Sequence, residues 1–424
     1  MRSIALDVHR DFSEVAIAEA GEVRLVGRVR TDPEALELFA RSLAATDLVA
    51  LEATGNGLAI ARILEPHVAR VLLANPKAVK GATQTAKTDK VDARTLAQLL
   101  AGGFLPEVWI VDEHTRVLRR RVTRRAQLVK QRTREKNQVH ATLIRNLKAR
   151  PPVTDLFGVR GRRWLAEQVL PEDELELVAA CLRNIDFLDG ELALIDKSLG
   201  EHALASPEMR RLMTLPGVSF VTAAALMAAI GDVSRFPTAG QLVAYLGVDP
   251  RVRQSGSERA RHGRISKQGP GEARHLLVEA AWHAARTTGP LRAFAERIKS
   301  KRGANVATVA VARKLVVIAW HMLSRGEDYA FARPSLVREK IRKLELATGA
   351  QRRQGRRNPV RVFATPQQHR LEKQLAAQAE TAYRRLVQDW QPAIKGAGAA
   401  PGRASSSQPK RQAARQETAP PPAL

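Results

Sequence analysis

The chain of 424 residues contains a single cysteine, Cys181. One cysteine cannot form a disulfide bond within the chain, and it cannot supply the several thiolates of a cysteine zinc cluster. Such sparse use of cysteine is typical of proteins that work in a reducing cytosol. We therefore expect a cytoplasmic protein without structural disulfides.

The sequence also lacks a hydrophobic run that suits a membrane span, which takes about 20 apolar residues. The longest runs are Val221–Ile230, which is too short, and Val306–Trp320, which carries Arg313 and Lys314. The N-terminus leads straight into a predicted strand, so no signal peptide is expected. We therefore expect no membrane partner.

Acidic residues are scarce in two parts of the chain. Residues 116–150 hold 13 Lys or Arg against one acid, Glu135, and residues 331–424 hold 19 against six. Nearly all of the net charge of +26 therefore lies in these two segments. Charge that is confined in this way predicts a polyanion partner, most naturally nucleic acid. An arginine-rich composition alone would explain the arginines but not the single acid in residues 116–150.

Residues 1–105 alternate predicted strands with predicted helices. The expected strands are Ile4–Val8, Val15–Glu19, Val23–Val29, Leu48–Ala53 and Val68–Ala74, and the expected helices are Asp32–Leu43, Asn56–Glu65 and one that begins near Asp89. Three strands followed by helix, strand, helix, strand and helix form the element order of an RNase H-like fold. The order predicts an α/β domain of this kind, although many α/β folds begin similarly.

Four acids occupy unusual positions in this region. Asp7 and Glu52 interrupt apolar runs that read as buried strands, where an unpaired carboxylate is costly. Asp89 and Asp92 are three residues apart, so they share one face of a helix. Together the four acids can converge on a Mg²⁺ site, because Mg²⁺ prefers oxygen ligands. Helix capping is the alternative for Asp89 and Asp92, but with Asp7 and Glu52 both in apolar strands we favour metal binding.

The middle of the chain predicts two long helices. Residues 113–150 read as one helix that ends at Pro151-Pro152. The second helix carries a heptad seam of about three heptads, formed by Val178, Cys181, Ile185, Leu188, Leu192, Ile195 and Leu199. The two helices can form an antiparallel hairpin, a dimer contact, or both.

Residues 206–330 are predicted to be mostly helical, with one long interruption. Leu212–Val218 resembles a helix-hairpin-helix turn that holds a phosphate, and a simple Pro-Gly turn between packed helices is the alternative. Residues Gly247–Gly271 read as a long loop that contains six basic residues and two acids. Loops of this length inside a compact domain are usually functional or disordered.

Ser255 lies near the middle of this loop, in Gln254-Ser255-Gly256. A serine hydroxyl is a nucleophile only when it is activated, and the neighbouring glycine lets a phosphate backbone approach closely. The surrounding arginines can clamp a phosphate and offset developing negative charge. Ser255 is therefore a candidate nucleophile, with an ordinary Ser-Gly turn as the alternative. Ser257 and Ser266 lie in the same loop, and chemistry alone does not choose among the three serines.

The order and spacing of these motifs resemble the DEDD transposases of the one-ten insertion-sequence family, some of which are called bridge recombinases. The resemblance covers roughly residues 1–325. It rests on Ile4-Ala5-Leu6-Asp7-Val8-His9, Leu51-Glu52-Ala53-Thr54-Gly55, Lys87-Thr88-Asp89-Lys90-Val91-Asp92-Ala93, Leu215-Pro216-Gly217-Val218, Ala244-Tyr245-Leu246-Gly247-Val248-Asp249-Pro250, Gln254-Ser255-Gly256 and Ile265-Ser266-Lys267-Gln268-Gly269.

The resemblance implies a RuvC-like domain in which Asp7, Glu52, Asp89 and Asp92 bind Mg²⁺, and a transposase domain in which Ser255 is the nucleophile. It implies a transposase or recombinase of an insertion sequence that forms a transient phosphoserine link to DNA. It further implies a homo-oligomer, either a dimer or a tetramer, whose acids and serine meet between subunits. The implied partners are DNA, both element ends and target, and a structured non-coding guide RNA. The implied location is the bacterial cytoplasm, at the nucleoid.

We thus expect an α/β RNase H-like (RuvC-like) DEDD metal-binding domain over residues 1–105 and a helical coiled-coil region over residues 106–205. A mostly α transposase domain with the serine loop follows over residues 206–330, and a basic, partly disordered tail over residues 331–424. The main alternative function is a RuvC-like structure-specific, metal-dependent nuclease, in which the acids cut with water and Ser255 only contacts phosphate. A third hypothesis is a non-enzymatic nucleic-acid scaffold.

Overall fold

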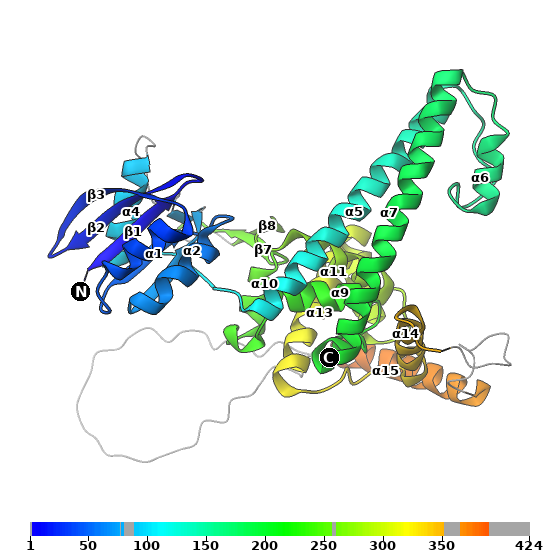
Figure 1. The fold of residues 1–424 in the computed structure, drawn as a ribbon. Helices are drawn as coiled ribbons and strands as arrows, with labels where there is room; N and C mark the ends of the chain where they lie inside the picture. Colours follow the sequence, from blue (N-terminus) through cyan, green and yellow to red (C-terminus); the bar gives the residue numbers. More distant parts are fainter. Residues whose placement is uncertain (1, 77, 80–88, 257–259, 352–364, 390–424) are drawn as a thin grey trace, which may run out of the picture. The chain divides into compact units, whose positions relative to one another are not determined.

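The computed structural model describes residues 2–76, 78–79, 89–256, 260–351 and 365–389, and it divides the chain into two compact units, Met1–Asp112 and Glu113–Leu424 (Figure 1). Each unit has hydrophobic cores of its own. Several predictions fall outside the described residues, namely those on Lys87, Thr88, Ser257, the side chain of Asp89 and the disordered end beyond residue 389.

Within its described residues, the first unit contains a six-stranded mixed sheet in the order β3-β2-β1-β4-β5-β6. The strands are β1 (Ser3–Val8), β2 (Phe12–Glu19), β3 (Glu22–Arg30), β4 (Leu48–Glu52), β5 (Arg70–Ala74) and β6 (Glu107–Val108). β1, β2 and β3 are antiparallel neighbours, β4 and β5 run parallel to β1, and β6 is antiparallel to β5. This mixed sheet fits the predicted RNase H-like domain.

The two faces of the sheet carry side chains of different size. Large apolar residues such as Leu6 and Leu51 form one face, in a single core with residues of α1 (Pro33–Arg41) and α2 (Gly57–Leu64). A 3-10 helix, Glu65–His67, follows α2. The other face packs against α4 (Asp89–Ala101) and is built mainly from alanines, which are Ala5, Ala16, Ala18, Ala50 and Ala74. Such small side chains let a helix pack close to a sheet.

Asp47 is a buried acid that precedes β4, at the end of the strand remote from Glu52. Its carboxylate is 1% exposed and accepts hydrogen bonds from Arg2 Nη2 at 2.5 Å, Arg2 Nε at 3.0 Å and the Ala44 amide at 2.8 Å. Burial raises the pKa of Asp47, but the bonds from Arg2 and Ala44 outweigh that effect and hold the pKa below its ordinary value of 3.8. The carboxylate therefore stabilises the fold as the ion.

We expect Asp47→Asn to lower the free energy of unfolding of the first unit by about 2 kcal/mol at pH 7, because charged hydrogen bonds of this kind are lost. Since the folded pKa is depressed, this stabilisation is present above pH 3.8 and disappears as the pH falls through the folded pKa. The free energy of unfolding of the two proteins is measured by urea titration, with hydrogen exchange of the amides in β1 and β4 as the probe of unfolding. Equal stability of the two proteins at pH 7 would contradict the prediction.

The second unit begins with an antiparallel helical hairpin formed by α5 (Glu113–Arg145) and α7 (Glu172–Ala205), and the connection between these two helices contains α6 (Val159–Ala166) (Figure 1). The seam of α7 packs with α5 residues in three clusters, one around Cys181, one around Leu188 and one that includes Leu199. Two ion pairs also join the helices: Arg125 Nε lies 2.5 Å from Asp196 Oδ1, and Arg132 Nη1 lies 2.5 Å from Asp189 Oδ1. The seam is therefore filled within one chain. Its use in a dimer, and the separate coiled-coil domain, stay predictions.

One helix boundary was predicted incorrectly. α5 ends at Arg145 and not at Pro151-Pro152. Leu147 takes a positive φ of 53°, so the backbone has left the helical conformation before the prolines are reached.

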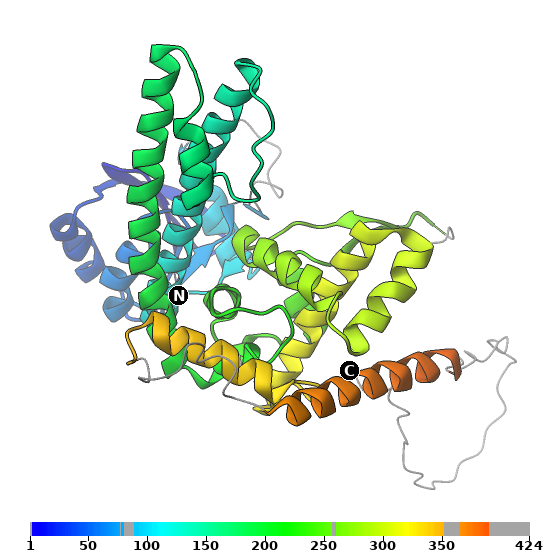
Figure 2. The same cartoon turned by 90° about the vertical axis from the view of Figure 1, so that its right-hand side faces the viewer.

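The remaining helices of the second unit contribute to one large core (Figure 2), except α15, which packs on α12 and α14. They are α8 (Pro207–Leu212), α9 (Phe220–Ile230), α10 (Ala239–Tyr245), α11 (Gly271–Ala284), α12 (Pro290–Arg302), α13 (Ala304–Arg325), α14 (Pro334–Ala347) and α15 (Pro366–Asp389), with a 3-10 helix at Val233–Arg235. Among the described helices, α13 alone is long and apolar enough to cross a membrane. Half of its most apolar part is buried inside the unit, as in the central helix of a globular core.

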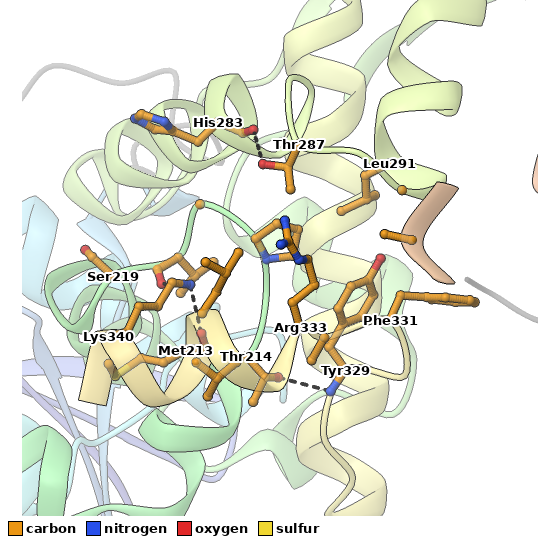
Figure 3. Close-up of a pocket in the computed structure, with 18 of the residues that line it drawn as sticks. Met213, Thr214, Ser219, His283, Thr287, Leu291, Tyr329, Phe331, Arg333 and Lys340 are labelled. Carbon is orange, nitrogen blue, oxygen red and sulfur yellow. Dashed lines mark hydrogen bonds between the residues drawn. The ribbon is translucent and has the colours of Figure 1, made fainter. Parts of the chain in front are cut away.

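In the turn that resembled a phosphate-binding hairpin, a lysine side chain binds backbone carbonyls (Figure 3). Lys340 Nζ donates to the carbonyls of Met213, Leu215 and Val218 at 3.0, 3.0 and 3.1 Å. Gly217 has a φ of 80°, and a Cβ there would lie 2.2 Å from the Ala280 carbonyl oxygen. The glycine is thus explained by close packing on α11. The turn borders a mostly apolar cavity of about 530 Å³ that none of the predicted site residues lines.

Candidate catalytic site

Two of the four predicted acids of the first unit lie at the carboxyl ends of adjacent parallel strands. The register pairs Leu6 of β1 with Leu51 of β4, so Asp7 and Glu52 are the next residues of each strand. By the alternation of side chains along a strand, both lie on the alanine face that packs against α4. α4 begins at Asp89 and carries Asp92 one turn later. The fold therefore brings two strands and one helix to the same place.

Two of the other predicted acids, Glu52 and Asp92, act electrostatically on Asp7. Burial raises the pKa of Asp7 to about 6, attraction to His9 opposes this rise, and the negative charges of Glu52 and Asp92 add to it. The side chain is 10% exposed, and His9 Nε2 lies 3.2 Å from Asp7 Oδ2. The acids thus repel one another in a partly desolvated place.

A hard divalent cation suits this donor chemistry. Among the described residues, no group of three or more His, Cys, Asp or Glu side chains is already arranged as a metal site. The side chain of the fourth predicted ligand, Asp89, is outside the described residues. Asp7, Glu52 and Asp92 still supply carboxylate oxygens whose mutual repulsion a Mg²⁺ ion would relieve. The residues present therefore fit the metal by chemistry, while Asp89 as a ligand stays a prediction.

Two further polar residues of this face were missed by the sequence analysis. His9 hydrogen-bonds Asp7, and Glu14 of β2 is the cross-strand partner of Asp7. The Glu14 side chain is 3% exposed, and Arg28 Nε donates to it at 2.8 Å. Its position two residues before Ala16, on a strand that alternates faces, was the signal that could have found it.

The predicted serine loop of the second unit is a β-hairpin. β7 (Pro250–Arg253) and β8 (Arg261–Ile265) pair antiparallel, which corrects the prediction of a continuous loop over Gly247–Gly271. These strands are too exposed and too rich in arginine to show an apolar alternation. Ser255 and Gly256 follow β7 and are exposed, and Gly256 has a φ of 56°.

Matches to known families extend over both units. A model described as "Transposase", of the DEDD type of the IS110 group, matches residues 4–146. A second model, described as "Transposase IS116/IS110/IS902 family", matches residues 209–296. The chain belongs to the IS110 family of transposases. The first match contains Asp7, Glu52, Asp89 and Asp92, and the second contains Ser255. Residues 331–424 lie outside both.

Curated relatives of this IS110-family transposase come from several bacteria. The transposase for insertion sequence element IS1111A of Coxiella burnetii is 26% identical, over 78% of this chain and 91% of the relative. The transposase for insertion sequence element IS1328 of Yersinia enterocolitica is 25% identical, over 67% of this chain and 85% of the relative. The pilin gene-inverting protein of Moraxella bovis is 27% identical, over 34% of this chain and 47% of the relative.

Two of the three candidate serines of this transposase differ in exposure and in hydrogen bonding. Ser266 is half-buried at the root of the hairpin, and its hydroxyl donates to Asp249 Oδ1 at 2.5 Å. Ser255 is exposed beside Gly256, where a polymer substrate can reach it. Ser257, the third candidate, lies outside the described residues. Accessibility therefore favours Ser255 over Ser266.

Proposed function

We propose that this IS110-family transposase cleaves and exchanges the DNA strands of an insertion sequence with Ser255 as the nucleophile. The observation that carries this proposal is the exposed Ser255-Gly256 pair in a hairpin whose exposed arginines are Arg251, Arg253, Arg261 and Arg264. A positive φ at Gly256 and its missing side chain suit the close approach of a phosphate backbone.

In the proposed step, Ser255 Oγ forms a bond to a DNA phosphorus atom, and the bond from that phosphorus to a deoxyribose oxygen breaks. The serine proton ends on the departing oxygen, so atoms and charge balance. Because a phosphodiester is exchanged for another, the reverse step can join the phosphate to a different DNA end. The guanidinium groups of Arg251 and Arg253 would neutralise the phosphate during both steps.

Asp7, Glu52, Asp89 and Asp92 would hold Mg²⁺ in the first unit. When bound, Mg²⁺ stabilises the attacking and leaving oxygens of a phosphodiester. His9 would orient the Asp7 carboxylate through its 3.2 Å contact. The predicted metal-binding acids and Ser255 belong to different units of the chain. The proposal is that acids of one subunit and the serine of another complete the site in a dimer or tetramer.

We propose DNA ends, target DNA and a structured guide RNA as partners, in the bacterial cytoplasm at the nucleoid. The charge of α5 supports these partners. Exposed arginines such as Arg124 and Arg134 lie along this helix, and residues 116–150 contain a single acid. Further support comes from the Moraxella bovis relative, whose name assigns it a gene inversion, which is a DNA rearrangement.

Trapping tests the proposal. Full-length protein with its co-purified RNA, Mg²⁺ and labelled DNA carrying the element's end is expected to give a protein–DNA adduct that survives denaturation. Omission of Mg²⁺ should prevent the adduct. Mg²⁺-dependent cleavage without any adduct would instead establish the nuclease, in which the four acids cut with water. DNA binding without cleavage or joining, with cognate RNA and DNA present, would favour the scaffold.

A further inference from the structure

The serine hairpin depends on its root for its orientation. It has two strands, β7 and β8, and most of its side chains are exposed. An isolated two-stranded ribbon is only marginally stable in water. The direction in which Ser255 points is therefore decided where the hairpin joins α10 and α11.

At the root, the backbone entering the hairpin packs directly on the backbone leaving it. Gly247 has a φ of 67°, and a Cβ there would lie 2.2 Å from the Gln268 carbonyl oxygen. Gly269 has a φ of 69°, and a Cβ there would lie 2.0 Å from the Tyr245 carbonyl oxygen. Both glycines are thus required by a positive φ and by a contact too close for any side chain.

Arg274 joins the two sides of this crossing. It is half-buried in the first turn of α11, and its Nη1 donates to the Leu246 carbonyl at 3.1 Å and to the Gln268 carbonyl at 2.8 Å. Among the described residues it forms no ion pair with a carboxylate. One guanidinium therefore ties the end of α10, the exit of the hairpin and the start of α11 together.

Asp249 and Ser266 form a second link across the root of the hairpin. The Ser266 hydroxyl donates to Asp249 Oδ1 at 2.5 Å, and the Ser266 amide donates to the Asp249 carbonyl at 2.9 Å. The Lys267 amide donates to the Gly247 carbonyl at 3.1 Å. These bonds close the base of the ribbon, and Arg274 anchors that base to the helical core.

We propose that Arg274 is a positioning residue for the nucleophile: it fixes the root of the serine hairpin and so holds Ser255 in the orientation that strand cleavage needs. The inference rests on the proposed function, because it takes Ser255 as the nucleophile. Arg274 touches no reacting atom in the proposed mechanism. It acts through two backbone carbonyls, and a displacement of about 1 Å at a reacting group can cost about 100-fold in rate.

The test compares Arg274→Met, which keeps the length of the side chain but removes its donors, with Arg274→Lys, which keeps a cationic donor. Arg286→Met, at an exposed arginine after the end of α11, is the control for loss of one positive charge. At saturating DNA, we expect Arg274→Met to form the adduct about 10- to 100-fold more slowly, with DNA affinity within twofold of the wild type. Arg274→Lys should recover part of the rate, and Arg286→Met should match the wild type.

Hydrogen exchange on the free full-length protein provides a second readout that needs no catalysis. The amides of Ser266 and Lys267 should exchange at least about tenfold faster in Arg274→Met, whereas amides in the core helix α13 should not change. Unchanged exchange at the root, or an unchanged adduct rate, would overturn the inference, as would equally faster exchange across the whole unit. A wild type without an adduct would refute the serine mechanism, and the exchange result would then still decide whether Arg274 holds the root.

Discussion

Ser255→Ala is expected to abolish the covalent protein–DNA adduct and to lower strand exchange by at least about 10³-fold, because alanine has no oxygen that can attack the phosphorus. The substitution removes one exposed hydroxyl next to Gly256 and leaves the ladder between β7 and β8 intact. DNA binding and thermal stability should therefore stay at wild-type values. Denaturing electrophoresis of labelled DNA measures the adduct, and filter binding measures the affinity.

Ser266→Ala is the matched control for this prediction. Its hydroxyl is bonded to Asp249 at the root of the hairpin, so its loss should cost about 1 kcal/mol of stability and slow adduct formation without abolishing it. The opposite pattern, with an adduct that survives Ser255→Ala and vanishes in Ser266→Ala, would make Ser266 the nucleophile and Asp249 its base.

Asp7→Asn is expected to lower Mg²⁺-dependent strand cleavage by about 10²- to 10⁴-fold. At the same time the variant should be at least as stable as the wild type when Mg²⁺ is absent. Burial, Glu52 and Asp92 all disfavour the Asp7 carboxylate, and a neutral amide of the same shape removes that cost. The stabilisation that Mg²⁺ gives to the wild type should be lost.

Asp47→Asn is the control for Asp7→Asn, because it shows what the loss of a buried acid does at a position that is not a predicted metal ligand. Both aspartates are buried in the first unit, but Asp47 is paired with Arg2, whereas Asp7 faces two other acids. Asp47→Asn should therefore lower the stability and keep the Mg²⁺ response. Thermal unfolding with and without Mg²⁺ measures both variants. If Asp7→Asn were destabilised and still cut DNA at the wild-type rate, Asp7 would be a structural residue and not a ligand.

Local patterns in the sequence determined a large part of the architecture. The order of strands and helices in residues 1–105 could be predicted, because buried strands and amphipathic helices impose different spacings on apolar residues. Asp7 and Glu52 were conspicuous for the same reason, since a carboxylate inside an apolar strand breaks the pattern. The heptad seam on α7 predicted a packed helix, and the structure places α5 against it.

The sequence by itself thus determined that an α/β region precedes a mostly helical one, while the division into two units and the surroundings of the candidate acids were decided by the tertiary structure. Only strand register shows that Glu14 opposes Asp7, and only the fold brings Asp92 near Asp7. The exposed strands β7 and β8 leave no apolar pattern, so their pairing could not be predicted. Arg274 has no local signal either, because its partners are backbone carbonyls, which every residue possesses and which only the folded chain brings within reach.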